Sequence, residues 1–423
     1  MITSIGKLRV VQLTQETLKI QCKIDDYEEW GAPMLDLQQY QRKEELQRAT
    51  SFSRRGSIFW ALVEDSKDSN DFNHVVEQPV LYCHCESHRF DCVVRRSSGD
   101  IEQGYSHHIG SVFTLPEYRN RGLAKIFMQE VARQLKKLPR ALVSILYSDI
   151  GPNFYDKLGW KLHPSKMAIL NVVSSRSISI ENKSGEEIVP LNLDTNLEKL
   201  LQHDNERLIS ELASEKYECQ EAFVVLPTRD SIEWQFCIGE YFAQIRGYKD
   251  TPTRCGVKIN KNAFILWCHN LKESTLYVVR SRFPEACEQS TTITCQLLNE
   301  ALSEANKFNL EKIAIWVPAK CLHDPGVQRY FEINFVDRES SLSSAIIFHH
   351  DSESNSPPKS LLQVTAEKNK TSLQQAVEEI KKRDSQLSCG AHHSKPAANH
   401  LALLQSNQED ALSFSTLHAS NRN

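Results

Sequence analysis

The sequence predicts an α/β fold in which helices cover a mixed β-sheet, followed by a second, similar block and a polar tail. Short apolar and β-branched runs, typical of strands, alternate with segments whose apolar residues recur every three or four positions, as in amphipathic helices. The same order of elements returns in the second half of the chain. After His350 the sequence becomes rich in Ser, Gln, Asn and Lys, a composition that does not support a packed core.

The first block contains enough expected strands and helices to form one α/β domain. Its last helix opens at Pro152 and closes at Gly159, because Pro is favoured in the first turn of a helix and Gly just past its end. The expected strands cover residues 8–13, 58–63, 80–85, 107–115 and 141–147, and the expected helices cover residues 15–22, 37–48, 123–138 and 152–159.

A second block repeats part of this order. Its expected elements are a strand at 276–280, a helix at 292–308, a strand at 312–317, an aromatic segment at 329–336 and a final strand at 345–348. A polar, Ser-rich stretch separates the two blocks. We therefore expect a first domain at residues 1–173, a linker at 174–190, a second domain at 191–350 and a disordered tail at 351–423.

Bulk composition excludes several functional classes. The chain has 423 residues, a net charge of −4 and an isoelectric point near 6.4, so it has no general attraction to nucleic acid or to an anionic membrane. It contains no apolar run of transmembrane length, and its first residues, MITSIGKLRV, lack a secretory apolar core. We expect a cytoplasmic protein, with the nucleus as a second compartment, and the oligomeric state stays open.

The cysteines predict reduced thiols rather than a disulfide scaffold. The 12 cysteines are scattered through predicted strands and helices, as in proteins of reducing compartments. The one tight group is Cys83-His84-Cys85 with His88. Its C-x-C spacing sends both thiols to one face of a strand, and no second ligand pair follows. We therefore expect no metal site.

A turn rich in arginine and small residues joins the fourth strand to the long helix. Its residues are Arg119, Asn120, Arg121, Gly122, Leu123 and Ala124. Gly122 and Ala124 let the backbone approach a bulky anion, towards which the first N–H groups of the helix point. Arg119 and Arg121 add charge-assisted hydrogen bonds. The segment predicts a pyrophosphate cradle, whereas neither a P-loop nor a dinucleotide-binding fingerprint is present. The alternative is a glycine that serves only as a helix cap.

The stretch from residue 109 to residue 160 resembles the coenzyme A-binding motif of the GNAT (Gcn5-related N-acetyltransferase) superfamily. That family's pattern is a strand, Pro-x-x-Arg-x-x-Gly-x-Ala/Gly and a helix, and residues 116–124 match it. The superfamily also places Asn, Phe-Tyr and Gly-Trp after the fifth strand, as in Asn153, Phe154-Tyr155 and Gly159-Trp160. The resemblance covers residues 8–170. It implies an N-terminal GNAT fold and, for the second block, a degenerate GNAT-like domain that has lost the cradle.

The resemblance also implies acetyl-CoA as co-substrate and assigns roles to individual residues. Backbone N–H groups of the fourth strand, at Val112, Phe113 and Thr114, would polarise the thioester carbonyl. Asn153 would contact the pantetheine arm. Tyr155 matches the family's general acid, because a phenol can donate a proton to the leaving thiolate; the alternative for Tyr155 is a packing aromatic.

The general base stays open on sequence grounds. An acceptor amine arrives protonated and loses a proton before it attacks. His107, His108, Glu102 and Glu117 lie in or beside the fourth strand, and a chain of waters is a further candidate. Strand alternation puts His107 and His108 on opposite faces, so at most one of them faces the cleft.

An acidic and aromatic segment precedes the second helix. The expected substrate-binding residues in it are Asp26, Tyr27, Glu28, Glu29 and Trp30. In the GNAT fold the loop between the first two helices covers the acceptor, and carboxylates interleaved with aromatics suit a cationic amine. The alternative is an exposed acidic helix end.

Three further segments, at residues 27–46, 146–152 and 226–234, resemble the fungal lysine N-acetyltransferases, which modify the ε-amino group of free lysine in its catabolism. This resemblance implies transfer of acetyl to L-lysine, or to a similar small cationic amine, by direct attack in a ternary complex. Two alternatives stay open. One is a protein acetyltransferase acting on lysine side chains or N-termini, and the other is a non-catalytic acyl-CoA-binding regulator or scaffold.

Overall fold

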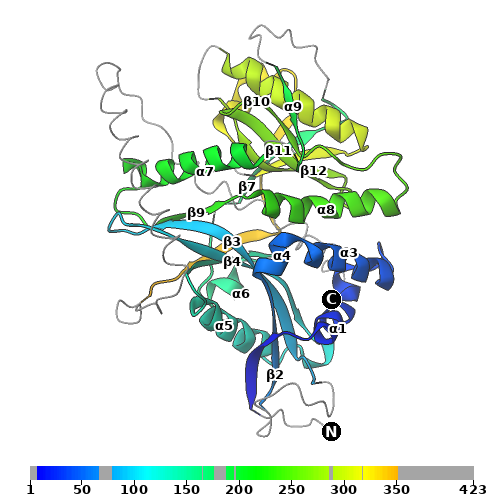
Figure 1. Cartoon of the computed structure of the whole chain (residues 1–423), viewed down its shortest axis with the longest axis vertical. Coiled ribbons are helices and arrows are strands. Elements are labelled where there is room, and N and C mark those ends of the chain that lie inside the picture. The colour runs from blue at the N-terminus through cyan, green and yellow to red at the C-terminus, as the bar shows by residue number, and fades with distance from the viewer. Residues whose placement is uncertain are drawn as a thin grey trace.

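The computed structural model describes residues 7–65, 79–163, 165–175, 187–194, 197–284, 289–316 and 318–350. The predicted tail at 351–423 lies outside these ranges, as does most of the predicted linker. The described part of the chain forms two mixed β-sheets with helices packed against them, which confirms the predicted α/β class (Figure 1). In that part no helix is both long and apolar enough to cross a membrane.

The first sheet has the strand order β1-β2-β3-β4-β5-β15-β6, with β9 paired to β3. These strands are β1 (Leu8–Leu13), β2 (Ser57–Glu64), β3 (Cys83–Arg95), β4 (Ile101–Thr114), β5 (Ala141–Ser148), β15 (Leu342–Ile347), β6 (Lys161–Leu162) and β9 (Ala222–Leu226). All five strands expected in the first block are present, but β3 and β4 extend well beyond the predicted bounds and form one long hairpin.

The second sheet has the strand order β14-β7-β13-β12-β11-β10-β8. Its strands are β14 (Ile333–Asp337), β7 (Lys166–Asn171), β13 (Lys312–Trp316), β12 (Thr275–Arg282), β11 (Ala263–Asn270), β10 (Gly256–Asn260) and β8 (Val189–Leu191). The strands expected at 276–280 and 312–317 correspond to β12 and β13.

Two groups of helices cover these sheets. With the first sheet lie α1 (Glu16–Asp25), α2 (Tyr27–Trp30), α3 (Leu37–Ala49), α4 (Ser51–Gly56), the 3-10 turn η1 (Pro116–Tyr118), α5 (Leu123–Lys136) and α6 (Asn153–Asp156). The later helices are α7 (Leu197–Ala213), η2 (Glu215–Tyr217), α8 (Arg229–Ile245), α9 (Ser290–Lys307), η3 (Lys320–His323) and α10 (Pro325–Gln328). We call the first sheet with its helices the first unit, and the second sheet with α7–α10 the second unit.

The two units exchange strands. β7 comes from the first block but lies between β13 and β14 of the second sheet. β15 comes from the end of the second block but pairs with β5 of the first sheet, from Leu342 opposite Ser148 to Ile347 opposite Val143. We expected β15 to close the second block, and this expectation was wrong. The last strand of each block completes the sheet of the other.

Helix α5 forms because its apolar residues recur on one face and because Gly122 starts it. Gly122 has φ +77° at the position before the first turn, and Phe127, Val131 and Leu135 are fully buried. They pack with Cys85 and other residues of the first sheet. Because strand side chains alternate, Cys83 and Cys85 face α5, and we call this the outer face of the sheet. Every cysteine in the described ranges is a free thiol.

The opposite face of the first sheet, which we call the inner face, is covered by both units. It carries His84, Glu86 and His88 of β3, and Lys23 of α1 contacts Glu86 on it while also pairing with Glu44 of α3. From the second unit, Trp234 of α8 lies 4.7 Å from the ring of His88 and 5.1 Å from that of Phe52. Figure 1 shows α8 lying between the second sheet and helices α3 and α4.

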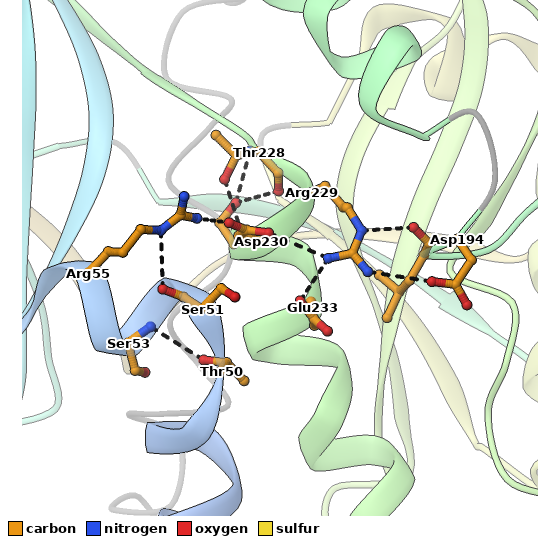
Figure 2. A network of polar contacts seen from close by, with 11 residues as sticks. Thr50, Ser51, Ser53, Arg55, Asp194, Thr228, Arg229, Asp230 and Glu233 are labelled. Carbon is orange, nitrogen blue, oxygen red and sulfur yellow. Dashed lines mark hydrogen bonds and ion pairs between the residues drawn. The ribbon is translucent and has the colours of Figure 1, made fainter.

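Polar contacts connect α4 to the first turn of α8 (Figure 2). Arg55 of α4 forms an ion pair with Asp230 in the first turn of α8, and its Nε donates to the carbonyl of Ser51 at 3.2 Å. The neighbouring Arg229 is held by the carboxylate of Glu233 at 2.9 Å. A capping box between Thr228 and Ser231 begins α8 at this point. The helix that covers the inner face is therefore anchored at its N-terminus to the first unit.

Candidate active site

The sheet opens between β4 and β5. The parallel pairing of these strands ends at Ile109 opposite Leu146, although β4 continues to Thr114 and β5 to Ser148. On its other edge β4 carries a bulge, because the register against β3 shifts by one residue between Gly110 and Phe113 and Ser111 adopts φ +52°. Bulges re-aim the backbone beside active sites. The last residues of β4, including the expected Val112, Phe113 and Thr114, border this β4/β5 opening.

The predicted cradle lies at the N-terminus of α5. Gly122 and Asn120 both have positive φ, +77° and +61°, so the chain turns sharply before Leu123 and Ala124 enter the helix. A Cβ on Gly122 would meet no atom within 4 Å. The glycine is therefore required for its left-handed backbone, and the space in front of it is open. A helix of this length offers its first N–H groups and its dipole to an anion.

The two cradle arginines are half-exposed and oriented by aromatic rings. Arg119 lies 5.3 Å from the ring of Phe113, and its Nε donates to the carbonyl of Thr114 at 3.0 Å. Arg121 lies 5.3 Å from the ring of Tyr118. The Nη2 of Arg119 is also 3.7 Å from the carboxylate of Glu29, an exposed ion pair of the kind that contributes little. Both guanidinium groups remain available to a stronger anion such as a pyrophosphate.

Tyr155 is buried on the outer side of the opening, in α6. Its ring packs edge-on against Trp160 at 6.2 Å and against Phe154 at 4.9 Å. Burial raises the pKa of the phenol well above its usual range, and the nearby Cys85 and Asp149 add to this. Tyr155 therefore stays protonated and able to donate, while also packing the core. Asn153 is exposed at the start of the same helix.

The four candidate bases are not brought together. His107 and His108 point to opposite faces, as alternation predicts. Burial, with Arg89 nearby, lowers the pKa of His107 to about 4, and burial lowers that of His108 well below its usual value. Glu102 lies at the far end of β4, 2.7 Å from the guanidinium of Arg96, and Glu117 is exposed in η1.

Some residues of the acidic segment are buried, and others are exposed to solvent. Asp26 is fully buried, and its Oδ1 accepts a hydrogen bond from the Tyr40 hydroxyl at 2.9 Å. Tyr27 donates to the carbonyl of Leu35. Trp30 is buried, 6.0 Å from the ring of Phe113, and joins the same apolar cluster as the second unit's core.

Glu28 and Glu29, the other two expected members of this segment, are exposed. Trp30 is the member of the segment that packs on the end of β4, against Phe113. The segment therefore reaches the opening through this ring, and the carboxylates of Glu28 and Glu29 are exposed.

Sequence reasoning missed a buried ionic cluster beneath α1. Its members are Lys23, Asp26, Lys43, Glu44 and Glu86. Lys23 contacts the carboxylates of Glu86 and Glu44, the latter at 3.0 Å, and lies 3.7 Å from Asp26. Glu86 lies opposite Gly110, at the bulge of β4. Nothing in the spacing of these charges distinguished them from the solvated face of a helix, because only the packing of α1 and α3 on the sheet buries them.

Burial sets the protonation states in this cluster. Burial opposes the charged form of Lys23, but Glu44, Glu86 and Asp26 raise its pKa well above the usual value. Burial raises the pKa of Asp26 to about 7 despite Lys23. The pKa of Glu44 is about 2, because Lys23 and Lys43 outweigh its burial. Burial, together with Lys23, lowers the pKa of His84 to about 3. The inner face therefore holds fixed charges next to neutral imidazoles.

Models of known protein families match both halves of the chain. A model of the acetyltransferase (GNAT) domain matches residues 41–163, and a model of the LYC1 GNAT-like C-terminal domain matches residues 172–360. The chain is thus an enzyme of the GNAT N-acetyltransferase class. Within that class it combines a GNAT acetyltransferase domain with a C-terminal domain of the LYC1 type.

Two curated relatives cover most of the chain. An uncharacterised protein of Saccharomyces cerevisiae, YGR111W, is 24% identical over 324 residues, which are 67% of this chain and 77% of that protein. A lysine acetyltransferase of Yarrowia lipolytica is 22% identical over 326 residues, 68% of this chain and 79% of that protein.

Among solved structures, a probable N-acyltransferase of Enterococcus faecalis has a TM-score of 0.48 at 12% identity, over 81% of this chain and 73% of that one. A GCN5-related N-acetyltransferase of Kribbella flavida has a TM-score of 0.47 at 15% identity, over 81% and 71%.

Proposed function

We propose that this acetyltransferase transfers the acetyl group of acetyl-CoA to the ε-amino group of L-lysine or a similar small cationic amine, by direct attack in a ternary complex. The observation that carries the proposal is the enclosure of the inner face beside the β4/β5 opening. Glu86, His88 and Gly110 are buried there, Glu86 against Lys23 of α1 and His88 against Trp234 of α8. An enclosed site favours a small acceptor, whereas a protein substrate requires an open groove for its chain.

The cradle and the opening account for the binding of acetyl-CoA. The pyrophosphate would lie at the N-terminus of α5, with Arg119 and Arg121 beside it. The pantetheine arm would run through the opening past Asn153. The thioester carbonyl would then accept hydrogen bonds from N–H groups at the end of β4, around Val112 and Phe113, which stabilise the negative charge of the tetrahedral intermediate.

The proposed transfer requires that one proton leaves the acceptor amine and that one proton reaches the departing sulfur. The acceptor amine gives up a proton, to a neutral imidazole or to water, and its nitrogen attacks the thioester carbon. The C–S bond then breaks, and Tyr155 donates its phenolic proton to the departing sulfur. The raised pKa of Tyr155 keeps that proton in place until the thiolate forms. The inward part of the acidic segment and the ionic cluster favour a positively charged acceptor on the same face.

The test is release of free thiol from acetyl-CoA by the purified protein against a panel of amines. The panel contains L-lysine, other amino acids, polyamines and lysine-containing peptides. We expect turnover with L-lysine. Turnover confined to peptides would instead make the chain a protein acetyltransferase. Binding of acetyl-CoA without turnover of any amine would contradict the proposal and favour an acyl-CoA-binding regulator.

A further inference from the structure

Asp26 lies where α1 meets α2, one helical turn before Trp30. Its backbone carbonyl accepts a hydrogen bond from the N–H of Trp30 at 3.2 Å, and the ring of Trp30 packs on Phe113 of β4 at 6.0 Å. Tyr40, whose hydroxyl donates to Asp26, belongs to the same apolar cluster as Trp30 and Phe113. Asp26 is therefore connected by direct contacts to the end of β4 that borders the opening.

One oxygen of the Asp26 carboxyl group has no hydrogen bond. Oδ1 accepts from Tyr40 at 2.9 Å, whereas Oδ2 is buried and has no hydrogen-bond partner among the described residues. The ammonium of Lys23 is 3.7 Å from Oδ2, which is too far for a hydrogen bond. His84, whose ring packs on Phe113 at 5.3 Å, also has a buried Nε2 without a partner in the described ranges. Buried polar atoms are normally satisfied, so both atoms have capacity for a ligand.

The charges of the ionic cluster do not balance. Three carboxylates face the ammonium groups of Lys23 and Lys43; they belong to Asp26, Glu44 and Glu86. Burial raises the pKa of Asp26 to about 7, although Lys23 opposes the rise. Glu44 and Glu86 keep 7% and 6% of their surface exposed, so the cluster is not sealed from solvent. A cationic acceptor would supply the third positive charge.

The carboxyl group of Asp26 is better suited to remove a proton than the imidazoles of the inner face. A general base works best when its pKa lies near the working pH, as that of Asp26 does. Burial, together with Lys23, lowers the pKa of His84 to about 3, and burial lowers that of His108 well below its usual value. Tyr40 orients Asp26 by holding Oδ1, as a third group orients the base in other active sites.

We propose that Asp26 is the general base, and that its Oδ2 takes a proton from the ammonium group of the acceptor. This inference rests on the proposed function. An N–H bond of the ammonium breaks and an O–H bond forms on Asp26, so the electron pair of the nitrogen can attack the thioester carbon. The C–S bond then breaks, and the sulfur takes the proton of Tyr155. After the products leave, Asp26 gives its proton to solvent and Tyr155 regains one.

The experiment measures kcat/KM between about pH 5 and 9, with the amine that the panel identifies, expected to be L-lysine. The kcat/KM of the wild type should rise with pH and level off, with its midpoint at the pKa of Asp26, about 7, because kcat/KM reports the groups of the free enzyme and only the ionised carboxylate takes a proton. Asp26→Asn should lower kcat/KM by about 10²- to 10⁴-fold, lose this midpoint and still bind acetyl-CoA.

The titratable side chains around Asp26 do not account for such a midpoint. Burial raises the pKa values of Cys22 and Tyr40 above their ordinary 9.0 and 10.0. The carboxylates around Lys23 raise its pKa above 10.5 against the effect of burial. The pKa values of Glu44 and His84, about 2 and about 3, lie far below 7. The remaining charged neighbours, Lys43 and Glu86, are held in ion pairs.

Two further variants should move the midpoint in opposite directions. The hydrogen bond from Tyr40 lowers the pKa of Asp26, and the charge of Glu44 raises it. The midpoint should therefore shift to higher pH in Tyr40→Phe and to lower pH in Glu44→Gln. A purely structural role for Asp26 predicts neither shift. These shifts decide the role of Asp26 even if Asp26→Asn does not fold.

Glu304→Gln is the matched control and should keep the wild-type midpoint. Glu304 is a buried carboxylate of the second unit, 3.0 Å from Nε2 of His269. A wild-type profile without a midpoint between about pH 6 and 8, or a midpoint that stays in place in Tyr40→Phe or Glu44→Gln, would overturn the role of Asp26. So would a wild-type profile in Asp26→Asn. Each of these results leaves the acetyltransferase proposal standing. Absence of turnover with every amine would overturn the proposed function, and the inference with it.

Discussion

At the scale of single residues, Tyr155 combines two roles that sequence reasoning treats as alternatives. Its ring packs in the core beside Phe154 and Trp160, and burial raises the pKa of its hydroxyl. Burial keeps the phenol protonated at neutral pH, so the proton is present to be donated to the departing sulfur, although the same burial makes the phenol a weaker acid. The packing role and the proposed role as general acid are therefore compatible.

Replacement of Tyr155 by Phe tests that role. The variant removes only the hydroxyl, so the fold and the binding of acetyl-CoA should be retained. We expect kcat to fall by about 10²-fold or more, the usual contribution of a general acid. Steady-state kinetics with acetyl-CoA binding measured in parallel checks this. Tyr248→Phe is the control, because its hydroxyl donates to the carbonyl of Phe308 in the second unit. Full activity of Tyr155→Phe would contradict the assignment.

The role of a single residue could be predicted from the sequence only where a local motif or pattern marks it. Gly122 was recognisable because a turn into an amphipathic helix demands a left-handed residue, and its φ is +77°. Glu86 was not recognisable, since it belongs to no motif. Its position beside the site depends on a register partner in β4 and on an ion pair with Lys23 of α1.

At the scale of elements, helix α1 docks on the sheet through charge as much as through apolar contact. Leu18 and Cys22 are buried, and so are the charged side chains of Lys23 and, at the C-cap, of Asp26. The spacing of apolar residues predicted the helix correctly, but its charged positions imply a solvated face. Burial of such charges is tolerated only when they are paired, and the partners come from α3 and β3.

The raised pKa of Asp26 predicts how stability depends on pH. Its ordinary value is 3.8 and its value in the folded protein is about 7. Between these values the folded protein binds one more proton than the unfolded chain. The contribution of Asp26 to the free energy of unfolding should therefore fall as pH rises from about 4 to 7, by at most about 1.4 kcal/mol per pH unit, and level off above pH 7.

Urea unfolding at pH 5, 6 and 7 measures this slope. Asp26→Asn removes the titrating group and keeps an oxygen for Tyr40. Buried histidines with lowered pKa values, such as His84 and His107, act in the opposite direction over the same window in both proteins. The free energy of unfolding of the wild type minus that of the variant should therefore fall from pH 5 to pH 7. Glu44 contributes in the opposite direction and in a lower window, between its ordinary value of 4.5 and about 2, so it does not mask the effect. Glu28→Gln, at an exposed position of α2, should keep the wild-type slope. Equal slopes in Asp26→Asn and the wild type would contradict the account.

At the scale of the whole molecule, the strand exchange makes the two units interdependent. Sequence reasoning found the α/β class and the tandem order, because both follow from local periodicity. It did not predict which sheet would take β7 or β15, since strand pairing over nearly 200 residues leaves no local signal. The helices α7 and α8 and the strands β10 and β11 were also missed, because the second block was identified only where it echoed the first.

The exchange predicts that both units unfold together. Leu170 in β7 is buried in the second unit's core, although the chain around it belongs to the first block. Leu170→Ala should destabilise the protein by about 2–5 kcal/mol, and should shift a single transition rather than split it. Tryptophan fluorescence and far-ultraviolet circular dichroism should give coincident unfolding curves. Two separated transitions would show that the units are independent in spite of the exchange.

The proposed activity depends on the buried inner face beside the opening between β4 and β5. The most direct measurement is identification by mass spectrometry and NMR of the product formed from L-lysine and acetyl-CoA. We predict Nε-acetyl-L-lysine in equimolar amount with free CoA, because each transfer to the ε-amino group releases one CoA thiol. Acetylation at the α-amino group, or hydrolysis of acetyl-CoA to CoA and free acetate without an acetylated amine, would contradict the account.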